Sequence, residues 1–312
     1  MKIFFIFTVE FYSLKIAAID IGSNAVRLLV SEVVVSGVEE PVFSKLNLFR
    51  IPIRLGMDVF ELGHITEEKS YMLIQTIKAF RHLINVYQVD HFRACATSAM
   101  REATNASHIK ASVKKETGVD IEIISGEEEA SLVFESGIAE HMSSDNDYMY
   151  IDVGGGSTEI SIFSLGNMIF KKSFEIGTIR ILKDTVDEQE WEEMKQAIKS
   201  NTKQLKSVMA IGSGGNINKV FSMSKKKEGK PLSIELLRDY YKELSSVTLE
   251  ERISLYNLRS DRADVIVPAL LIYLNAMRWA GASEISVPKI GLVDGLVKHQ
   301  WYELASVISN SD

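Results

Sequence analysis

Some segments of the chain have apolar residues at the spacing of a helix, and others have the short apolar runs of strands. The two kinds of segment alternate along the chain. After the capping residue Thr66, apolar residues three and four apart, among them Leu73, Ile77 and Phe80, predict one buried face of a helix. Short apolar runs bounded by glycine or polar residues predict strands at 16–19, 26–35, 41–48, 92–96, 121–124, 148–150, 160–163, 170–174, 208–211 and 284–287. Further helices are predicted over 105–118, from 125 to about 141, and over 188–206, 217–223, 233–246, 249–256, 261–280 and 296 to about 307. The alternation indicates an α/β fold.

Three glycine-rich turns follow predicted strands. The turns at 20–24 and 152–159 each lie between two strands, whereas the turn at 212–216 opens a helix. Glycines permit a tight turn and expose consecutive backbone N–H groups, which suit a phosphate. A repeated Asp-Gly hairpin indicates a duplicated domain that closes on a phosphorylated ligand, as in the actin, sugar kinase and Hsp70 class of folds. A hairpin with a flexible glycine turn is the alternative.

Candidate ligands flank these turns. Asp152 and Glu159 bracket the second turn, and a carboxylate beside a phosphate usually means a divalent cation between them, with Asp20 as a further candidate. Arg50, Arg54 and Arg180 follow strand ends and could contact phosphate through the guanidinium, although a solvated loop is the alternative for Arg50 and Arg54. The candidate phosphate-binding residues of the turns are Gly22, Ser23, Asn24, Gly154, Gly155, Gly156 and Ser157.

The composition narrows the class of protein. The chain has 312 residues, enough for two domains, and its net charge of −7 argues against a general nucleic-acid binder. A polyanionic substrate would need only a local basic groove. The single Cys95 excludes an internal disulfide and fits a cytoplasmic protein. No run reaches the roughly 18 apolar residues of a membrane span, and residues 1–14 are expected to be an N-terminal extension rather than a signal peptide.

Five motifs together resemble the exopolyphosphatase and guanosine pentaphosphate phosphohydrolase (Ppx/GppA) family, from about Lys15 to the last helix. The Ser-Gly-x-Glu-Glu-Ala box, which ends at Ala130, narrows the resemblance to this family. The motifs are Asp20-x-Gly22-Ser23-Asn24, Glu122-x-x-Ser125-Gly126-x-Glu128-Glu129-Ala130, Asp152-x-Gly154-Gly155-Gly156-Ser157-Thr158-Glu159, Gly177-x-x-Arg180 and Arg262-x-Asp264-x-Ile266.

The resemblance implies two actin-like (ribonuclease H-like) domains with a cleft between them. The expected division is 1–126, completed by 296–312, and 127–295. It implies hydrolysis of a terminal phosphoanhydride bond, in polyphosphate or guanosine pentaphosphate, with Mg²⁺ or Mn²⁺. It places the catalytic glutamate at Glu129, an arginine at Arg101, and the acidic metal positions at Asp152 and Glu159. A homodimer is possible, and no nucleic acid or membrane partner is expected.

The sequence departs from the family pattern in a few places. Ala25 replaces a hydroxyl residue, and Ser98 replaces a more polar one. Val293 stands where an arginine is usual, and the loss of this arginine is expected to affect substrate binding rather than the fold. Two other functions stay open: an actin-like ATPase or kinase, and a non-catalytic regulator that binds an alarmone. Glu127 and Glu128 add like charge beside Glu129 and could raise its pKa.

Overall fold

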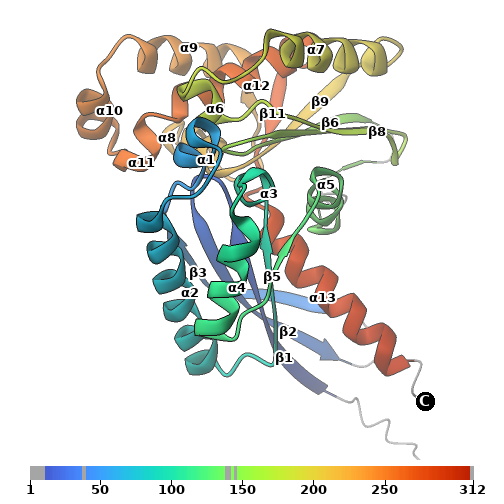
Figure 1. Cartoon of the computed structure of the whole chain (residues 1–312). Helices are drawn as coiled ribbons and strands as arrows, with labels where there is room; N and C mark the ends of the chain where they lie inside the picture. The colour runs from blue at the N-terminus through green and yellow to red at the C-terminus, as the bar shows by residue number, and fades with distance from the viewer. Residues whose placement is uncertain (1–10, 37–39, 138–141, 144–145, 310–312) are drawn as a thin grey trace, which may run out of the picture.

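The computed structural model describes residues 11–36, 40–137, 142–143 and 146–309. The predicted N-terminal extension and the predicted helix end near residue 141 lie largely outside these ranges. The described chain contains two β-sheets, each flanked by helices (Figure 1).

The first sheet has five strands in the order β3-β2-β1-β4-β5. The first three strands form an antiparallel meander, and β4 and β5 continue parallel to β1. Because side chains alternate across a strand, Ile16 and Ala18 face one core while Ala17 and Ile19 face another. The strand bounds are β1 Phe11–Ile21, β2 Val26–Ser36, β3 Val42–Ile51, β4 His91–Ala96 and β5 Ile121–Ile123.

The second sheet repeats this arrangement. Its six strands run β10-β11-β9-β6-β7-β8, with an antiparallel meander of β6, β7 and β8 and with β9 and β11 parallel to β6. The strand bounds are β6 Asp147–Val153, β7 Thr158–Ser164, β8 Asn167–Phe174, β9 Val208–Ser213, β10 Leu232–Ser233 and β11 Glu284–Ser286. The repetition places the first two glycine turns at equivalent hairpins, as the sequence predicts.

Helices separate and cover the sheets. The helices α2 (Glu67–Tyr87) and α4 (Ala106–Thr117) pack on the outer face of the first sheet. The helices α5 (Gly126–Glu135) and α13 (Leu292–Ser309) share a hydrophobic core with both sheets. In this core Leu132 of α5 and Leu296 of α13 cluster with Ile16 of the first sheet and with Tyr150 of the second. The division of the chain after residues 126 and 295 stays a prediction, because these two helices contact both sheets.

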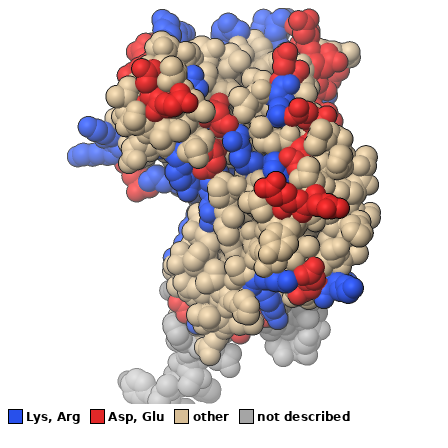
Figure 2. Space-filling view, turned by 60° about the vertical axis from the view of Figure 1, so that its left-hand side comes forward, with Lys and Arg blue, Asp and Glu red and all other residues tan. Residues whose placement is uncertain are grey.

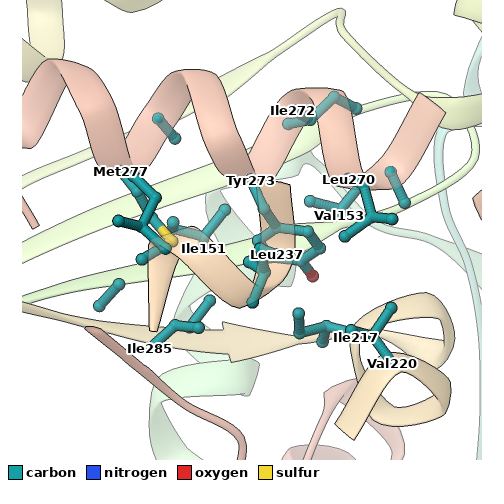
Figure 3. Close-up of a cluster of buried hydrophobic side chains, with 14 of the residues drawn as sticks. Ile151, Val153, Ile217, Val220, Leu237, Leu270, Ile272, Tyr273, Met277 and Ile285 are labelled. Carbon is teal, nitrogen blue, oxygen red and sulfur yellow. The ribbon is translucent and has the colours of Figure 1, made fainter. Parts of the chain in front are cut away.

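The largest core lies on the outer face of the second sheet (Figure 3). There α12 (Ile266–Ala280) directs Tyr273 and Met277 toward Ile151 and Ile285 of the sheet. By length and composition alone the stretch Ser260–Ala280 could cross a membrane, although charged residues interrupt it and no run of about 18 apolar residues is present in it. Its burial against the sheet makes it a core helix. The other helices of this half are α6 Thr178–Leu182, α7 Glu188–Thr202, α8 Gly215–Met223, α9 Ile234–Ser245, α10 Leu249–Tyr256 and α11 Ser260–Ala263.

Three details differ from the predicted elements. The predicted helix 261–280 is broken between α11 and α12 at Asp264, whose carboxylate pairs with Arg54 at 2.6 Å. The predicted loop after Arg54 contains α1 (Gly56–Leu62), whereas the short helix α3 (Ser98–Glu102) lies where the segment 97–103 is expected to open a helix. The strand β3 extends to Ile51, so that Arg50 lies in the sheet.

Candidate active site

A cavity lies where the hairpin turns of the two sheets meet. All three glycine-rich turns line it, together with α5 and the loop before α13. Figure 2 shows Lys and Arg side chains gathered at this level, where the upper and lower parts of the molecule meet. Of the predicted site residues, the lining includes Asp20, Gly22, Ser23, Asn24, Glu129, Asp152, Gly154, Gly155, Ser157 and Glu159.

The first two glycine turns are closed by matching backbone hydrogen bonds. The N–H of Gly22 donates to the carbonyl of Ala25 at 3.1 Å, and that of Gly154 donates to Ser157 at 3.0 Å. The two turns also touch, since a Cβ on Gly155 would lie 2.9 Å from the Cβ of Ser23. The structure therefore brings both predicted phosphate-binding turns to one place.

Gly156 has a packing role instead. A Cβ there would overlap the Phe60 ring and the Ser98 hydroxyl, and the Gly156 carbonyl accepts a hydrogen bond from Arg180 Nε at 2.7 Å. Gly156 does not line the cavity. Phosphate contact by Gly156 stays a prediction, and the contacts observed there are structural, because this glycine packs the turn against α1 and α3.

Four carboxylates converge on the cavity, two of them buried (Asp20 and Glu159) and two half-buried (Glu129 and Asp152). Asp20 ends β1, Asp152 and Glu159 lie on β6 and β7, and Glu129 lies in the first turn of α5. The Ser125 hydroxyl accepts from the N–H of Glu128 at 3.1 Å, which caps α5 and starts the helix that presents Glu129. The Oε2 atom of Glu129 is buried and has no hydrogen-bond partner.

Burial and mutual repulsion weaken these acids. Burial raises the pKa of Asp152 to about 7, with the charge of Glu159 adding to the effect. Burial also raises the pKa of Glu129 well above its usual range, as do the charges of Glu159, Asp20 and Asp152, whereas Arg101 lowers it. The pKa values of Asp20 and Glu159 are raised by burial as well. Such shifts are typical of groups that act in proton transfer or bind a cation.

The donor set suits a hard divalent cation. All four groups offer carboxylate oxygens, and one of these atoms is buried without a partner. Within the described ranges no three acidic, histidine or cysteine side chains form a complete metal cluster. Mg²⁺ commonly uses one or two carboxylates together with phosphate oxygens and water, so the site fits a cation that arrives with phosphate.

Five basic residues complete the lining: Arg27, Lys45, Arg50, Arg262 and Lys289. Four of them pair with acids, at 2.5 Å for Arg27–Asp20, 2.6 Å for Lys45–Asp294, 2.6 Å for Arg50–Asp261 and 3.1 Å for Lys289–Glu228. The side chains of Lys45 and Lys289 are 47% and 48% exposed, against 4% for Asp20 and 13% for Glu129, whereas Arg50 at 13% is as buried as Glu129. The two lysines thus lie nearer to solvent than the carboxylates, and the arginines lie among them.

Arg262 differs from the other four basic residues. It has no side-chain hydrogen bond or ion pair in the described part of the chain, and its guanidinium lies against Gly215, where a Cβ would come within 2.9 Å. Burial lowers its pKa to about 10, and nearby Arg50, Arg259 and Arg27 lower it further. A buried cation surrounded by like charge is stabilised by an anion.

The predicted arginines other than Arg50 lie elsewhere. Arg180 is buried, donates to Glu102 and lies over the Phe60 ring, 4.2 Å from its centroid. Arg54 pairs with Asp264. Neither lines the cavity, so the structure does not support phosphate contact by these two residues: a guanidinium suits a carboxylate as well as a phosphate. Arg101 donates to the carbonyl of Ile124 at 2.8 Å and lies 3.9 Å from Glu129.

Sequence reasoning missed most of the basic lining. Arg27 had a readable signal, because it interrupts an apolar run directly after the first glycine turn. Arg262 stands in a motif quoted above, yet no role was assigned to it. Lys45 and Lys289 carry no local signal, since their place at the cavity depends on the packing of β3 and of the loop before α13.

Comparison with known proteins identifies the family. The Ppx/GppA phosphatase family matches residues 34–301. Exopolyphosphatase 1 of Mycobacterium tuberculosis is 26% identical over 309 residues, covering 91% of this chain and 87% of that protein. A bifunctional 3-dehydroquinate synthase/phosphatase of Fusobacterium nucleatum is 29% identical over 307 residues, of which the match covers 87% of this chain but only 44% of the relative.

Solved structures agree on the fold. An exopolyphosphatase from Cytophaga hutchinsonii superposes with a TM-score of 0.76 at 25% identity, covering 90% of this chain and 96% of that one. A Ppx/GppA family member from Aquifex aeolicus gives a TM-score of 0.73 at 24% identity, covering 94% and 99%. These matches confirm the predicted α/β fold with two actin-like domains. The chain belongs to the Ppx/GppA phosphatase family.

Proposed function

We propose that this protein hydrolyses the terminal phosphoanhydride bond of inorganic polyphosphate and releases orthophosphate. The observation that carries the proposal is that one cavity is lined both by four carboxylates, including Glu129, and by five basic residues, of which Lys45 and Lys289 are the most exposed. A phosphoryl group at the carboxylates would leave the following phosphates beside the bases. The exopolyphosphatase name of the mycobacterial relative supports the same chemistry.

The lining favours polyphosphate over guanosine pentaphosphate. Its apolar members, such as Leu48, Ile290 and Val293, are aliphatic, and no aromatic ring of the described chain lines the cavity to stack on a base. Recognition of the guanine ring would therefore depend on hydrogen bonds alone. Recognition of a phosphate chain through its negative charge needs no aromatic ring.

Glu129 is the proposed general base. Its unpartnered Oε2 would accept a proton from water, whose oxygen forms a bond to the terminal phosphorus while the bond from that phosphorus to the bridging oxygen breaks. The bridging oxygen leaves with the shortened chain. The glycine turns at Gly22 and Gly154 would hold the equatorial oxygens through backbone N–H groups. Mg²⁺ held by Asp152 and Glu159, with Asp20 as a further ligand, would neutralise phosphate charge.

The test is orthophosphate release in the presence of Mg²⁺ from long-chain polyphosphate, guanosine pentaphosphate and ATP, each offered separately. We expect polyphosphate to be the best substrate and Glu129→Gln to lower kcat by about 10²–10⁴-fold while polyphosphate still binds. Glu127→Gln, an exposed neighbour in the same helical turn, is the matched control. Faster ATP turnover would favour an ATPase, and alarmone binding without any release would favour a receptor.

A further inference from the structure

The helix α5, which carries Glu129, is held from two opposite sides. On one side it touches α13 at the backbone, because a Cβ on Gly295 would overlap the carbonyl oxygen of Leu132. Leu132 and Val133 also share a core with Leu296. This side is mainly apolar and closely packed, and His299 of α13 adds a polar contact, with its Nδ1 2.7 Å from Oε2 of Glu135.

The other side of α5 faces β8, and the contact there is polar. Lys171 Nζ donates to the carbonyl of Glu127 at 2.8 Å and to the Ser131 hydroxyl at 2.6 Å. The same hydroxyl donates to the Glu127 carbonyl at 2.9 Å. Lys171 thus contacts the helix two residues before and two residues after Glu129. Among the described residues it has no carboxylate partner.

The same face of β8 also holds Glu159. Ser173 donates to Glu159 Oε1 at 2.8 Å. A Cβ on Gly126, the first residue of α5, would lie 2.7 Å from the Ser173 Cβ, so the start of the helix sits directly on this serine. Lys171 and Ser173 are two residues apart and share one face, whereas Lys172 points away and pairs with Glu193 at 3.1 Å.

We propose that Lys171 is a positioning residue that fixes α5 on β8 and so sets the distance between Glu129 and Glu159. This inference deepens the function proposed above and rests on Glu129 as the base. Without the ammonium group, packing against α13 would still keep α5 folded, but the polar contact on the side of β8 would be gone. The helix could then shift relative to Glu159.

The first test compares Lys171→Met with Lys172→Met, the neighbouring lysine on the opposite face. We expect Lys171→Met to lower kcat at least 10-fold with KM unchanged within about twofold, because a displacement on the order of 1 Å at a catalytic group costs about 10²-fold. Lys171→Arg, which keeps a multiple donor, should restore most of the kcat. An unchanged kcat, or an equal loss in Lys172→Met, would overturn the proposal.

A second measurement does not depend on activity. Backbone hydrogen exchange of the peptide 126–135 should speed up in Lys171→Met and stay at the wild-type rate in Lys172→Met. Equal exchange in both variants would reject the positioning role. If the wild-type protein released no phosphate from any substrate, the proposed function would fail, and the exchange experiment alone would decide whether Lys171 holds α5.

Discussion

Asp152 and Glu159 are direct cross-strand partners in the hairpin of β6 and β7. At the equivalent hairpin of the first sheet, Asp20 faces Arg27 and pairs with it. Like charges directly opposite each other destabilise a sheet, and burial also disfavours the charged form of both acids. The fold therefore carries an electrostatic cost at neutral pH where the proposed cation would bind.

Asp152→Asn should stabilise the protein, and more so at alkaline pH. The folded-state pKa of about 7 lies above the ordinary value of 3.8, so the charged form is disfavoured in the folded state and stability falls as pH rises through this window. Asparagine removes the charge. We expect the Tm without Mg²⁺ to rise by about 4 °C or more at pH 8 and by less at pH 5.5.

Asp239→Asn, an exposed aspartate on α9, is the control for this experiment and should leave the Tm unchanged. Asp152→Asn should also lower phosphate release strongly. A Tm that falls in Asp152→Asn at pH 8 would show that the buried charge is already compensated in the folded protein.

The rate of hydrolysis should depend on the pH in a way set by Glu129. A general base acts when deprotonated, and a raised pKa means that activity is lost on acidification at a pH above the 4.5 of an ordinary glutamate. Arg101 lowers this pKa, so Arg101→Met should move the acidic limb of the kcat profile to higher pH. Arg93→Met, which removes the cation beside Glu128, is the control. An acidic limb at the same pH in wild type and Arg101→Met would argue against Glu129 as the base.

Substitution of Arg262 should weaken substrate binding, whereas substitution of Arg180 should lower the stability of the fold. Arg262→Gln removes an unpaired cation from the cavity, so we expect KM for polyphosphate to rise at least 10-fold, with a weaker dependence of KM on salt, and an unchanged or higher Tm. Arg180→Gln leaves Glu102 without its cation and should destabilise the fold by about 1–3 kcal/mol with little change in KM.

Steady-state kinetics and urea unfolding of the two arginine variants check this pair of outcomes. Because Glu102 is the partner of Arg180, a second change to Glu102→Gln should recover part of the lost stability. A large rise of KM in Arg180→Gln with normal stability would restore the original prediction that this arginine binds phosphate.

Asp294→Asn should improve substrate binding. Asp294 lies in the cavity wall, pairs with Lys45 and accepts from the N–H of Gly291 at 3.0 Å. Asparagine keeps an acceptor for Gly291 but removes a negative charge near the polyanion and frees the ammonium of Lys45. We expect KM for polyphosphate to fall about 2–10-fold at low salt, and Lys45→Met to raise it. A higher KM in Asp294→Asn would mean that the ion pair between Lys45 and Asp294 is itself needed to form the binding site for polyphosphate.

The sequence was sufficient for features that depend on neighbouring residues. The two Asp-Gly hairpins, the capped helix that begins after Ser125 and the strand order within each meander follow from local patterns. Glu129 was placed by resemblance to a family motif. Each of these signals lies within about ten residues of chain, the range over which turn and helix chemistry operates.

Features that depend on distant partners were not predictable. Arg180 resembled a phosphate ligand because Glu102, its partner, is 78 residues away in the chain. The break between α11 and α12 occurs at Asp264, which pairs with Arg54 from the other half of the chain. Gly156 could not be distinguished from Gly155 until Phe60 and Ser98 were seen to pack against it.

The repeated hairpin has a further consequence. Arg27 and Glu159 occupy equivalent positions in the two hairpins, so this position carries opposite charge in each half of the molecule. Two identical copies would make a symmetric cavity, in which a linear polymer could lie in either direction. This difference in sign helps to make the two ends of the cavity unlike. The exopolyphosphatase activity proposed above, which would shorten a polymer from its terminus, requires a cavity whose two ends differ.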